Sequence, residues 1–479
     1  MTPTRLAPLP LALLALAGCG SGTPAPPAGV CSLTRPALPT SRLHTDGTTL
    51  RDALDRVVVL RGVDAGGRSK LTPFAPFDFT GDGYDAALGA YLDRAASWGI
   101  NVLRVPFVWA AVEPTQGSYD QAFLTRYDAL LDGAFARGML TVVDFHQDVY
   151  ADVFCGDGFP DWTLTPPYPA PHDDCPNWGG EYLGDPSVQA AYDAFWATGS
   201  PVRTAYGALW DMMATRYAAR PGVIGFEPFN EPGWGSADMA TWEATTLTTF
   251  YGQMTASLHA AAPDALVFFD ATGVDGVTAQ TSLGLPAGSG LVFAPHYYQY
   301  AALGGTAPDS DLVPVSLRDW SNVGAGWGVP SFLGEFGASN PTPDVAAYLS
   351  AHFDALDALG MSGTEWEYSV ATEMWNGEDL SLVAADGTEN PSAAAILRPY
   401  ARAVAGSGVV FSYDSTSRAA SLQYTPAAGV SEVAVPVRAY PAGYTVKVTG
   451  GCADSSQQGV LLVQADPGAT SVAVEVTAR

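Results

Sequence analysis

Short apolar runs rich in β-branched residues alternate along the chain with longer stretches of helical periodicity. The apolar runs lie at Val57–Gly62, Asn101–Val108, Leu140–Phe145, Val223–Phe229, Ala265–Ala271, Leu291–His296, Ser331–Phe336 and Gly363–Tyr368. The helical stretches lie at Tyr84–Trp98, Gln121–Arg137, Ala190–Arg220, Ala240–Ala261 and Asp344–Leu359. Continuous apolar strands that alternate with helices indicate a parallel sheet, and eight such units predict an α/β fold, a (β/α)8 TIM barrel. An open doubly wound sheet is the alternative, but no glycine-rich phosphate loop follows the first strand.

The pattern changes after Ala405 to short alternating runs separated by Gly, Pro, Asp and Ser. These runs lie at Val409–Tyr413, Ala419–Tyr424, Glu432–Val437, Tyr444–Thr449, Val460–Gln464 and Ser471–Val476. Alternation of this kind is typical of strands with one buried face, and six short strands predict a small all-β sandwich. We therefore expect a catalytic barrel over residues 41–403 and an accessory β-sandwich over residues 404–479.

The first residues have the shape of an export signal. Arg5 precedes an apolar run, Leu9 to Ala17, that is too short to span a bilayer and fits a secretory h-region. The segment Leu16-Ala17-Gly18-Cys19 resembles a bacterial lipobox, which would make Cys19 the lipidated first residue. We expect a signal peptide over 1–18, a tether over 19–40 and a secreted or cell-surface lipoprotein held at a membrane. An ordinary signal peptide cleaved elsewhere is the alternative.

The remaining cysteines favour disulfides. If Cys19 is lipidated, four cysteines remain, and an even number of cysteines outside the cytoplasm favours disulfide bonds. Four cysteines allow three different pairings. Cys155 and Cys175 lie in one loop-like stretch rich in Pro, Gly and Asp, so this pairing is favoured, and Cys31 with Cys452 would follow by elimination. No Cys/His spacing resembles a zinc site, and we expect neither a metal nor a cofactor.

Charge narrows the range of partners. The chain carries 22 Lys+Arg against 49 Asp+Glu, a formal net charge of -27. Such a surface repels phosphate backbones, which makes nucleic acid a poor partner. Twelve Trp, 21 Tyr and 20 Phe could form walls for sugars or lipid chains, although aromatic residues more often belong to the core. We expect a monomer that binds a glycan or glycolipid.

Polar and aromatic residues gather where the predicted strands end. Functional residues of a TIM barrel lie at these carboxyl ends. The residues concerned are Arg104, Asp144, His146, Asp148, Glu227, Asn230, Glu231, His296, Tyr298, Gln299, Glu335 and Trp366. Arg104 stands inside an apolar strand, and because a buried unpaired charge costs several kcal/mol, a buried acidic partner is implied.

Two of these residues, Glu231 and Glu335, would face each other across the barrel mouth. Glycoside hydrolysis needs one carboxylic acid to protonate the leaving oxygen and one carboxylate to trap the anomeric carbon, about 5–5.5 Å apart in retaining enzymes. Arg104, His296 and Tyr298 would hold Glu335 ionised and oriented. Alternation along the strand places Tyr298, rather than Tyr297, on the side of His296. Asn230 could bind the sugar 2-hydroxyl, and Trp366 could lie under a pyranose ring.

The ordered set Arg104, His146, Asn230-Glu231-Pro232, His296/Tyr298, Glu335 and Trp366 resembles glycoside hydrolase family 5. The chain is similar to the endoglycoceramidase and glycosylceramidase branch of this family through Ser69-Lys70 with Pro73-Phe74, Asp144–Tyr150 and Gly156–Trp162. The resemblance implies that Glu231 is the acid/base and Glu335 the nucleophile. It also implies sugar-binding roles for Lys70, His146, Asp148, Asn230, Gln299 and Trp366. The implied substrate is a glycosphingolipid that is cut between its reducing-end sugar and ceramide.

A ceramide needs a broad apolar slot beside the polar sugar site. Candidate aromatic residues for this slot are Phe154, Phe159, Trp162, Tyr168, Trp178, Tyr297 and Tyr300. The alternative functions are a β-1,4-glucanase or other β-glycosidase of the same family, and a non-catalytic glycan-binding surface lipoprotein. A pure binder has no need of the glutamate pair, so the residues favour an enzyme.

Overall fold

The computed structural model describes residues 29, 31–37, 43–165, 175 and 178–479. The predicted signal peptide, the lipidation site Cys19 and Tyr168 lie outside these residues. No helix in the described part of the chain combines the length and the apolar content that crossing a membrane requires.

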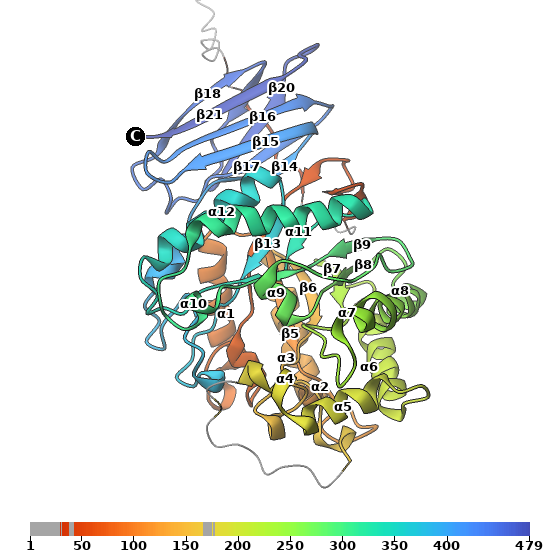
Figure 1. The fold of residues 1–479 in the computed structure, drawn as a ribbon. Coiled ribbons are helices and arrows are strands. Elements are labelled where there is room, and N and C mark those ends of the chain that lie inside the picture. Colours follow the sequence, from red (N-terminus) through yellow and green to blue (C-terminus); the bar gives the residue numbers. More distant parts are fainter. Residues whose placement is uncertain (1–28, 30, 38–42, 166–174, 176–177) are drawn as a thin grey trace, which may run out of the picture.

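Eight parallel strands form the sheet at the centre of the molecule (Figure 1). In chain order they are β4 (Arg61–Asp64), β5 (Val102–Phe107), β6 (Leu140–Phe145), β7 (Val223–Glu227), β8 (Leu266–Phe269), β9 (Leu291–Phe293), β11 (Phe332–Leu333) and β13 (Ser362–Glu365). A parallel bridge between Phe293 and Ser331 joins the two ends of the sheet. Beyond it, β10 (His296–Tyr297) pairs in parallel with β12 (Glu335–Phe336). The predicted TIM barrel is confirmed.

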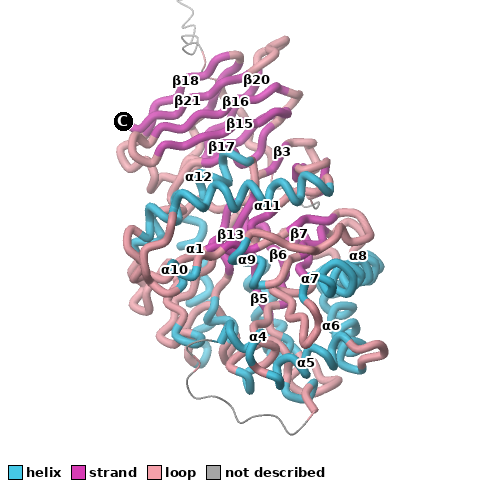
Figure 2. The backbone as a smooth tube through the Cα atoms, viewed as in Figure 1, coloured by secondary structure: helices cyan, strands magenta, loops and turns pink. Residues whose placement is uncertain are grey.

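Helices surround this sheet, as the backbone view in Figure 2 shows. The longest are α1 (Tyr84–Ser97), α3 (Gln121–Ala136), α5 (Pro186–Trp196), α6 (Pro201–Tyr217), α8 (Thr248–Ala261), α11 (Val313–Trp327) and α12 (Val345–Leu359). The single helix expected over Ala190–Arg220 is two helices. Gly199 takes a positive φ of 76°, Ser200 caps α6 by accepting from the Arg203 backbone N–H, and Pro201 occupies its first turn. These residues break the predicted helix, because a glycine with positive φ cannot continue it and Ser200 and Pro201 favour a new helix start.

The barrel interior changes character along its axis. Its lower part is apolar and holds residues from most strands, namely Leu60, Val102, Leu140, Val142, Ile224, Leu266, Phe268, Val292, Ala294 and Phe332. Since side chains alternate along a strand, the periodicity that points Val102 and Val142 inward also points Arg104 and Asp144 inward, one step nearer the carboxyl ends. The upper interior is therefore charged, while the apolar lower part supports it.

The C-terminal residues form two packed antiparallel sheets, which confirms the predicted sandwich. One sheet has the order β15 (Gly406–Asp414), β16 (Ala419–Pro426), β21 (Val472–Ala478), β18 (Tyr444–Thr449). The other contains β14 (Tyr400–Val404), β17 (Val430–Ala434), β20 (Val460–Ala465) and β19 (Gly451–Asp454). It is extended by three strands from the other end of the chain: β1 (His44–Asp46), β2 (Thr49–Arg51) and β3 (Val57–Val58). Residues 44–58, which were expected in the barrel domain, thus contribute strands to the sandwich sheet.

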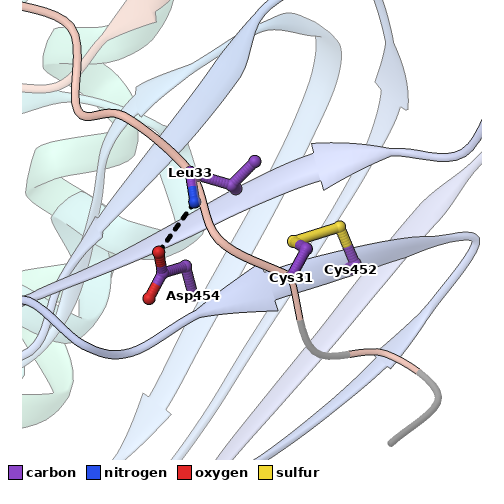
Figure 3. The surroundings of a disulfide bond; sticks show 4 residues. All are labelled: Cys31, Leu33, Cys452 and Asp454. Atoms are coloured by element: carbon purple, nitrogen blue, oxygen red, sulfur yellow. Dashed lines mark hydrogen bonds between the residues drawn. A yellow bond between two sulfur atoms is a disulfide. The ribbon is translucent and has the colours of Figure 1, made fainter. Parts of the chain in front are cut away.

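Residues 31–37, which were expected to belong to a free tether, lie on the sandwich. Cys31 forms a disulfide with Cys452 of β19, and the Leu33 backbone N–H donates to Asp454 at 2.8 Å (Figure 3). The Cys31 backbone N–H donates to the Ala453 carbonyl, and the Ala453 N–H donates to the Gly29 carbonyl, so this segment continues the sheet edge. The described part of the predicted tether is therefore an extra edge segment fixed by a covalent bond.

The sandwich lies against the amino-terminal ends of the barrel strands. Strand β3 leads directly into β4, and Arg402 donates to the carbonyl of Gly138, just before β6. A Cβ on Gly99, just before β5, would stand 2.6 Å from Pro436. The carboxyl ends of the strands, where function is expected, are at the opposite end of the barrel.

Candidate active site

The two predicted catalytic glutamates meet at the carboxyl end of the barrel. Glu231 follows β7, and Glu335 is the first residue of β12. An oxygen of each carboxylate and a ring nitrogen of His296 all lie within 4.8 Å of one another. The His296 Nδ1 is 2.8 Å from Glu231 and 3.5 Å from Glu335. This separation allows both carboxyl groups to reach one anomeric carbon, as retaining glycosidases require.

Two hydrogen bonds hold the Glu335 carboxylate. Arg104 donates to its Oε1 at 2.7 Å, and the Tyr298 hydroxyl donates to its Oε2 at 2.9 Å. Burial alone would raise the pKa of Glu335, but the charges of His296 and Arg104 outweigh it and lower the pKa below its ordinary value. Glu335 is therefore an ionised, oriented carboxylate at neutral pH. Tyr298 makes the contact, as strand alternation predicts, and Tyr297 does not.

His296 is itself held in the charged form. Burial alone would lower the pKa of its imidazole, but the carboxyl groups of Asp270, Glu335 and Glu231 raise it well above the ordinary value. Among the described residues, two groups of three could in principle offer metal ligands, and both include His296. A protonated imidazole donates hydrogen bonds instead of binding metal, so the chemistry of this donor set favours a proton-bearing role.

Arg104 is fully buried and has the acidic partners that the sequence implies. Its Nε and one terminal nitrogen donate to Glu227 at 2.7 and 2.9 Å, and the same terminal nitrogen donates to Asn230 Oδ1 at 2.7 Å. Asp64 and Asp144 lie 3.3 and 3.2 Å from the guanidinium. The amide group of Asn230 is thereby fixed beside Glu231.

The backbone at Glu231 adopts an unusual conformation that Asp270 supports. The φ of Glu231 is 39°, in the left-handed region that non-glycine residues rarely occupy. Its backbone N–H donates to Asp270 Oδ2 at 3.2 Å, and the same oxygen is 3.3 Å from His296 Nε2. A Cβ on Gly273 would come within 2.5 Å of the Glu231 carboxylate, so the next loop also confines this side chain. Sequence reasoning missed Asp270, although it lies near the carboxyl end of the predicted strand Ala265–Ala271 and directly follows β8.

A second polar group lies beside the glutamates. Lys70 donates to Asp148 at 2.5 Å, and His146 donates to Asp144 at 2.9 Å with its other nitrogen 3.4 Å from Asp148. Burial would lower the pKa of His146, but its hydrogen bonds to the two carboxylates raise it to about 10. Burial would raise the pKa of Asp148, but Lys70 and His146 lower it to about 2. The ring of Trp366 is parallel to that of His146, with 5.0 Å between centroids.

These residues line a single cavity of about 590 Å³. Its walls contain Lys70, His146, Asp148, Glu231, Tyr298, Glu335 and Trp366, together with the apolar residues Leu183, Trp234, Val274, Val277, Tyr300, Leu303 and Leu380. Tyr300 and Leu183 are 70% and 64% exposed. The cavity therefore joins a polar, charged part to an apolar part with exposed side chains. Glu378, which the sequence did not single out, is also in its wall.

Several residues that the sequence suggested for the substrate site lie elsewhere. Gln299 does not line the cavity, because its amide both donates to and accepts from the Asp309 backbone at 2.8 Å and so closes the loop that follows β10. Phe154, Phe159 and Tyr297 are buried in the core, and Trp162 packs against Trp109. Of the aromatic residues suggested for the ceramide slot, Trp178 and Tyr300 line the cavity.

The loop next to the cavity carries a disulfide between Cys155 and Cys175. The carbonyl of Cys155 accepts from the side-chain amide of Asn376 at 2.7 Å, which ties this loop to the one after β13. Glu367 accepts from the backbone N–H of Gly67 at 2.6 Å and supports the segment that carries Lys70.

A TIM barrel whose mouth holds two carboxyl groups around one cavity, one of them ionised by flanking cations, has the arrangement of a glycoside hydrolase. Family comparison agrees with this class. Residues 68–372 match the model of "Cellulase (glycosyl hydrolase family 5)", and residues 398–477 match the "Glycoside hydrolase family 5 C-terminal domain". The chain belongs to glycosyl hydrolase family 5.

Individual relatives refine the comparison. The chain is 27% identical over 473 residues to "Endoglycoceramidase I" of Rhodococcus hoagii, which covers 92% of this chain and 89% of that protein. A solved structure of "Endo-glycoceramidase II from Rhodococcus sp.: Lactosyl-Enzyme Intermediate" superimposes with a TM-score of 0.74 at 25% identity, covering 90% of this chain and 99% of that one. "Endoglucanase CelA" of Streptomyces lividans is 27% identical over 351 residues, covering 71% of this chain and 58% of that protein.

Proposed function

We propose that the protein is an endoglycoceramidase-like retaining hydrolase, which cleaves the β-glycosidic bond between the sugar and ceramide of a glycosphingolipid. The observation that carries the proposal is a single cavity in which paired carboxyl groups adjoin an exposed apolar wall. The likeness to endoglycoceramidases of Rhodococcus over nearly the whole chain supports it.

In the first step, the Glu335 carboxylate attacks the anomeric carbon while Glu231 donates its proton to the ceramide oxygen. The carbon–oxygen bond to ceramide breaks, a covalent glycosyl ester with Glu335 forms, and ceramide leaves as the alcohol. In the second step, Glu231 takes a proton from water, the hydroxide attacks the same carbon, and Glu335 is released. Two inversions at one carbon retain the β configuration.

The surrounding residues prepare these steps. Arg104 and Tyr298 orient Glu335 from two sides, and the fixed geometry places its oxygen for attack without reorganisation. Asn230 is aligned by Arg104 to bind the hydroxyl next to the anomeric carbon. Lys70, His146 and Asp148 would bind the remaining hydroxyls, and Trp366 would lie against the sugar ring.

The aglycone site is the apolar part of the cavity. Leu183, Tyr300 and Leu303 are exposed side chains at its edge, and exposed apolar residues grouped around a cavity mark a site for an apolar ligand. A glucan chain would place polar sugars against these residues. The apolar wall therefore favours a lipid aglycone over the β-1,4-glucanase alternative.

Turnover on a substrate panel tests the proposal. Lactosylceramide, glucosylceramide, galactosylceramide and carboxymethylcellulose are incubated with the protein, and the products are identified by mass spectrometry. We expect intact glycan and ceramide from at least one glycolipid. Cellulose cleavage without release of ceramide from any glycolipid would contradict the proposal and favour the glucanase.

We also propose that the protein is held at a membrane surface through lipid-modified Cys19, at the site of a membrane-bound substrate. The lipobox-like sequence supports this proposal. In cells, the wild-type protein should partition into the detergent phase and incorporate labelled fatty acid, whereas Cys19→Ala should do neither. Equal partitioning of both proteins would contradict the anchor.

A further inference from the structure

The loop that follows β13 is fixed against three neighbouring elements. Asn376 donates to the Cys155 carbonyl, and Asn340 donates to Asp379 at 2.9 Å. Leu380 packs with Tyr298 and Trp366. Any side chain that this loop directs into the cavity therefore has a defined position.

Glu378 is such a side chain. It lines the cavity, and its Oε2 lies 3.8 Å from Lys70 Nζ. The same Lys70 ammonium group already donates to Asp148 at 2.5 Å. The Oε2 atom is buried and has no hydrogen-bond partner among the described residues. Burial raises the pKa of Glu378 to about 7, although the charge of Lys70 opposes the shift.

Folding gains little from this carboxylate. A buried acceptor without a donor loses the hydrogen bonds that it had with water, which costs free energy. Asp148 already neutralises Lys70, so Glu378 is not needed as its counter-ion. The Glu378 oxygen is a fixed hydrogen-bond acceptor next to the residues that would bind sugar. A ligand that supplies hydrogen-bond donors would explain its position, and sugar hydroxyls are such donors.

We propose that Glu378 is a specificity-determining residue, which accepts hydrogen bonds from glycan hydroxyls beside Lys70 and disfavours an anionic substituent at the same place. The inference rests on the proposed function and adds the class of glycan, neutral at this position. A hydroxyl satisfies the free oxygen of Glu378. A sulfate ester or sugar carboxylate would face both Glu378 and Asp148, and like charges this close repel.

The test compares neutral and anionic forms of one glycan. Wild type, Glu378→Gln and the control Glu373→Gln are assayed at pH 8, where Glu378 is ionised. Glu373 belongs to the same loop, but its side chain is 64% exposed. The substrates are lactosylceramide, its sulfate ester on the sugar, and dinitrophenyl β-lactoside. Thermal midpoints of the three proteins check that each is folded.

We expect Glu378→Gln to raise KM for both neutral substrates about tenfold, the effect of weakening one charged hydrogen bond. For the sulfated substrate kcat/KM should stay the same or rise. The ratio of kcat/KM for lactosylceramide to kcat/KM for its sulfate ester should therefore fall at least about tenfold. Glu373→Gln should leave this ratio unchanged. A merely structural counter-ion of Lys70 would alter both substrates by the same factor.

An unchanged ratio in Glu378→Gln would overturn the proposal, whatever happens to the absolute rates. Binding of lactose and of lactose sulfate, measured by calorimetry on the same three proteins, gives the ratio without any turnover. If wild type releases no ceramide, the proposed function fails. The binding ratio and the dinitrophenyl substrate still decide the role of Glu378.

Discussion

The two ends of the barrel both bury arginines and carboxylates, but they balance the charges differently. At the end that meets the sandwich, Arg61 and Arg398 share Asp357, with distances of 2.9 and 2.7 Å. Nearby, Arg56 lies between Asp52 and Glu432 at 2.7 and 2.8 Å. Three buried cations face three buried anions, so each charge removed from water has a partner of opposite sign.

At the other end the acids outnumber the cations. Arg104 and His296 are surrounded by Asp64, Asp144, Glu227, Asp270 and Glu335. One oxygen of Asp64 and one of Asp144 are buried without a hydrogen-bond partner among the described residues. Buried excess charge lowers stability, and a site that retains it uses the strong fields for chemistry. The balanced charges therefore stabilise the region where the barrel meets the sandwich, whereas the unbalanced ones set protonation states.

The largest expected effect comes from removing the proposed nucleophile. Glu335→Ala should lower kcat by roughly 10⁴ to 10⁶-fold, because the covalent step is lost. Azide should restore turnover of dinitrophenyl β-lactoside and give the α-glycosyl azide, which NMR identifies. The fold should persist, since removing one acid relieves the excess of negative charge. A variant that retains wild-type kcat would contradict the assignment.

Glu231→Ala should have the next largest effect, and that effect should depend on the leaving group. Ceramide is a poor leaving group, so loss of the general acid should slow its release by about 10² to 10⁴-fold. Dinitrophenolate needs no proton, and glycosylation by this substrate should be nearly unchanged in a stopped-flow burst. Equal losses on both substrates would show that Glu231 is not the acid.

A matched pair of Asp→Asn substitutions compares the two ends directly. Asp357→Asn should lower the free energy of unfolding by about 3–5 kcal/mol, because Arg61 and Arg398 lose their shared buried anion. Denaturant titration measures this loss. The kcat of the molecules that remain folded should equal that of wild type, since the site lies at the other end. A fall in kcat without a fall in the free energy of unfolding would contradict the structural role of Asp357.

The smallest expected effect is that of Asp64→Asn at the mouth. Burial, opposed by Arg104 and reinforced by Glu335, raises the pKa of Asp64 well above its ordinary value. The folded state therefore holds this proton more tightly than the unfolded state, and wild-type stability falls as pH rises above the ordinary aspartate range. Asn cannot ionise, so the variant should match wild type near pH 4 and be more stable by roughly 1 kcal/mol at pH 7. The raised pKa would be contradicted if the free energy of unfolding of the variant, minus that of wild type, were lower at pH 7 than at pH 4.

Much of the fold could be predicted because strand patterns are local. The apolar runs indicated the barrel, and alternation placed Arg104, His296 and Tyr298 on the inner face. Strands β1 and β2 were missed, because strands of three residues carry no periodic signal. Val57–Val58 was predicted as the start of the first barrel strand, but it forms β3 of the sandwich sheet, because its partner β14 lies about 350 residues away in sequence.

The errors in the site have a common cause. Alternation says which face a strand residue occupies, but it says nothing of loops beyond the strand. Gln299 was expected at the cavity but is not in its wall, and its hydrogen bonds to the Asp309 backbone exist only in the folded loop. Glu378 was missed for the same reason, since its place beside Lys70 depends on a loop more than ten residues beyond β13. Asp270 stood at a strand end and could have been found from the sequence.

The stereochemistry of the first-formed sugar tests the central claim most directly. Lactosylceramide is hydrolysed in the NMR tube with a high concentration of the protein, and the anomeric proton is followed before mutarotation. Paired action by Glu231 and Glu335 predicts that the β anomer of lactose accumulates first. Initial accumulation of the α anomer would mean a single displacement by water, and would contradict the role of Glu335 as nucleophile.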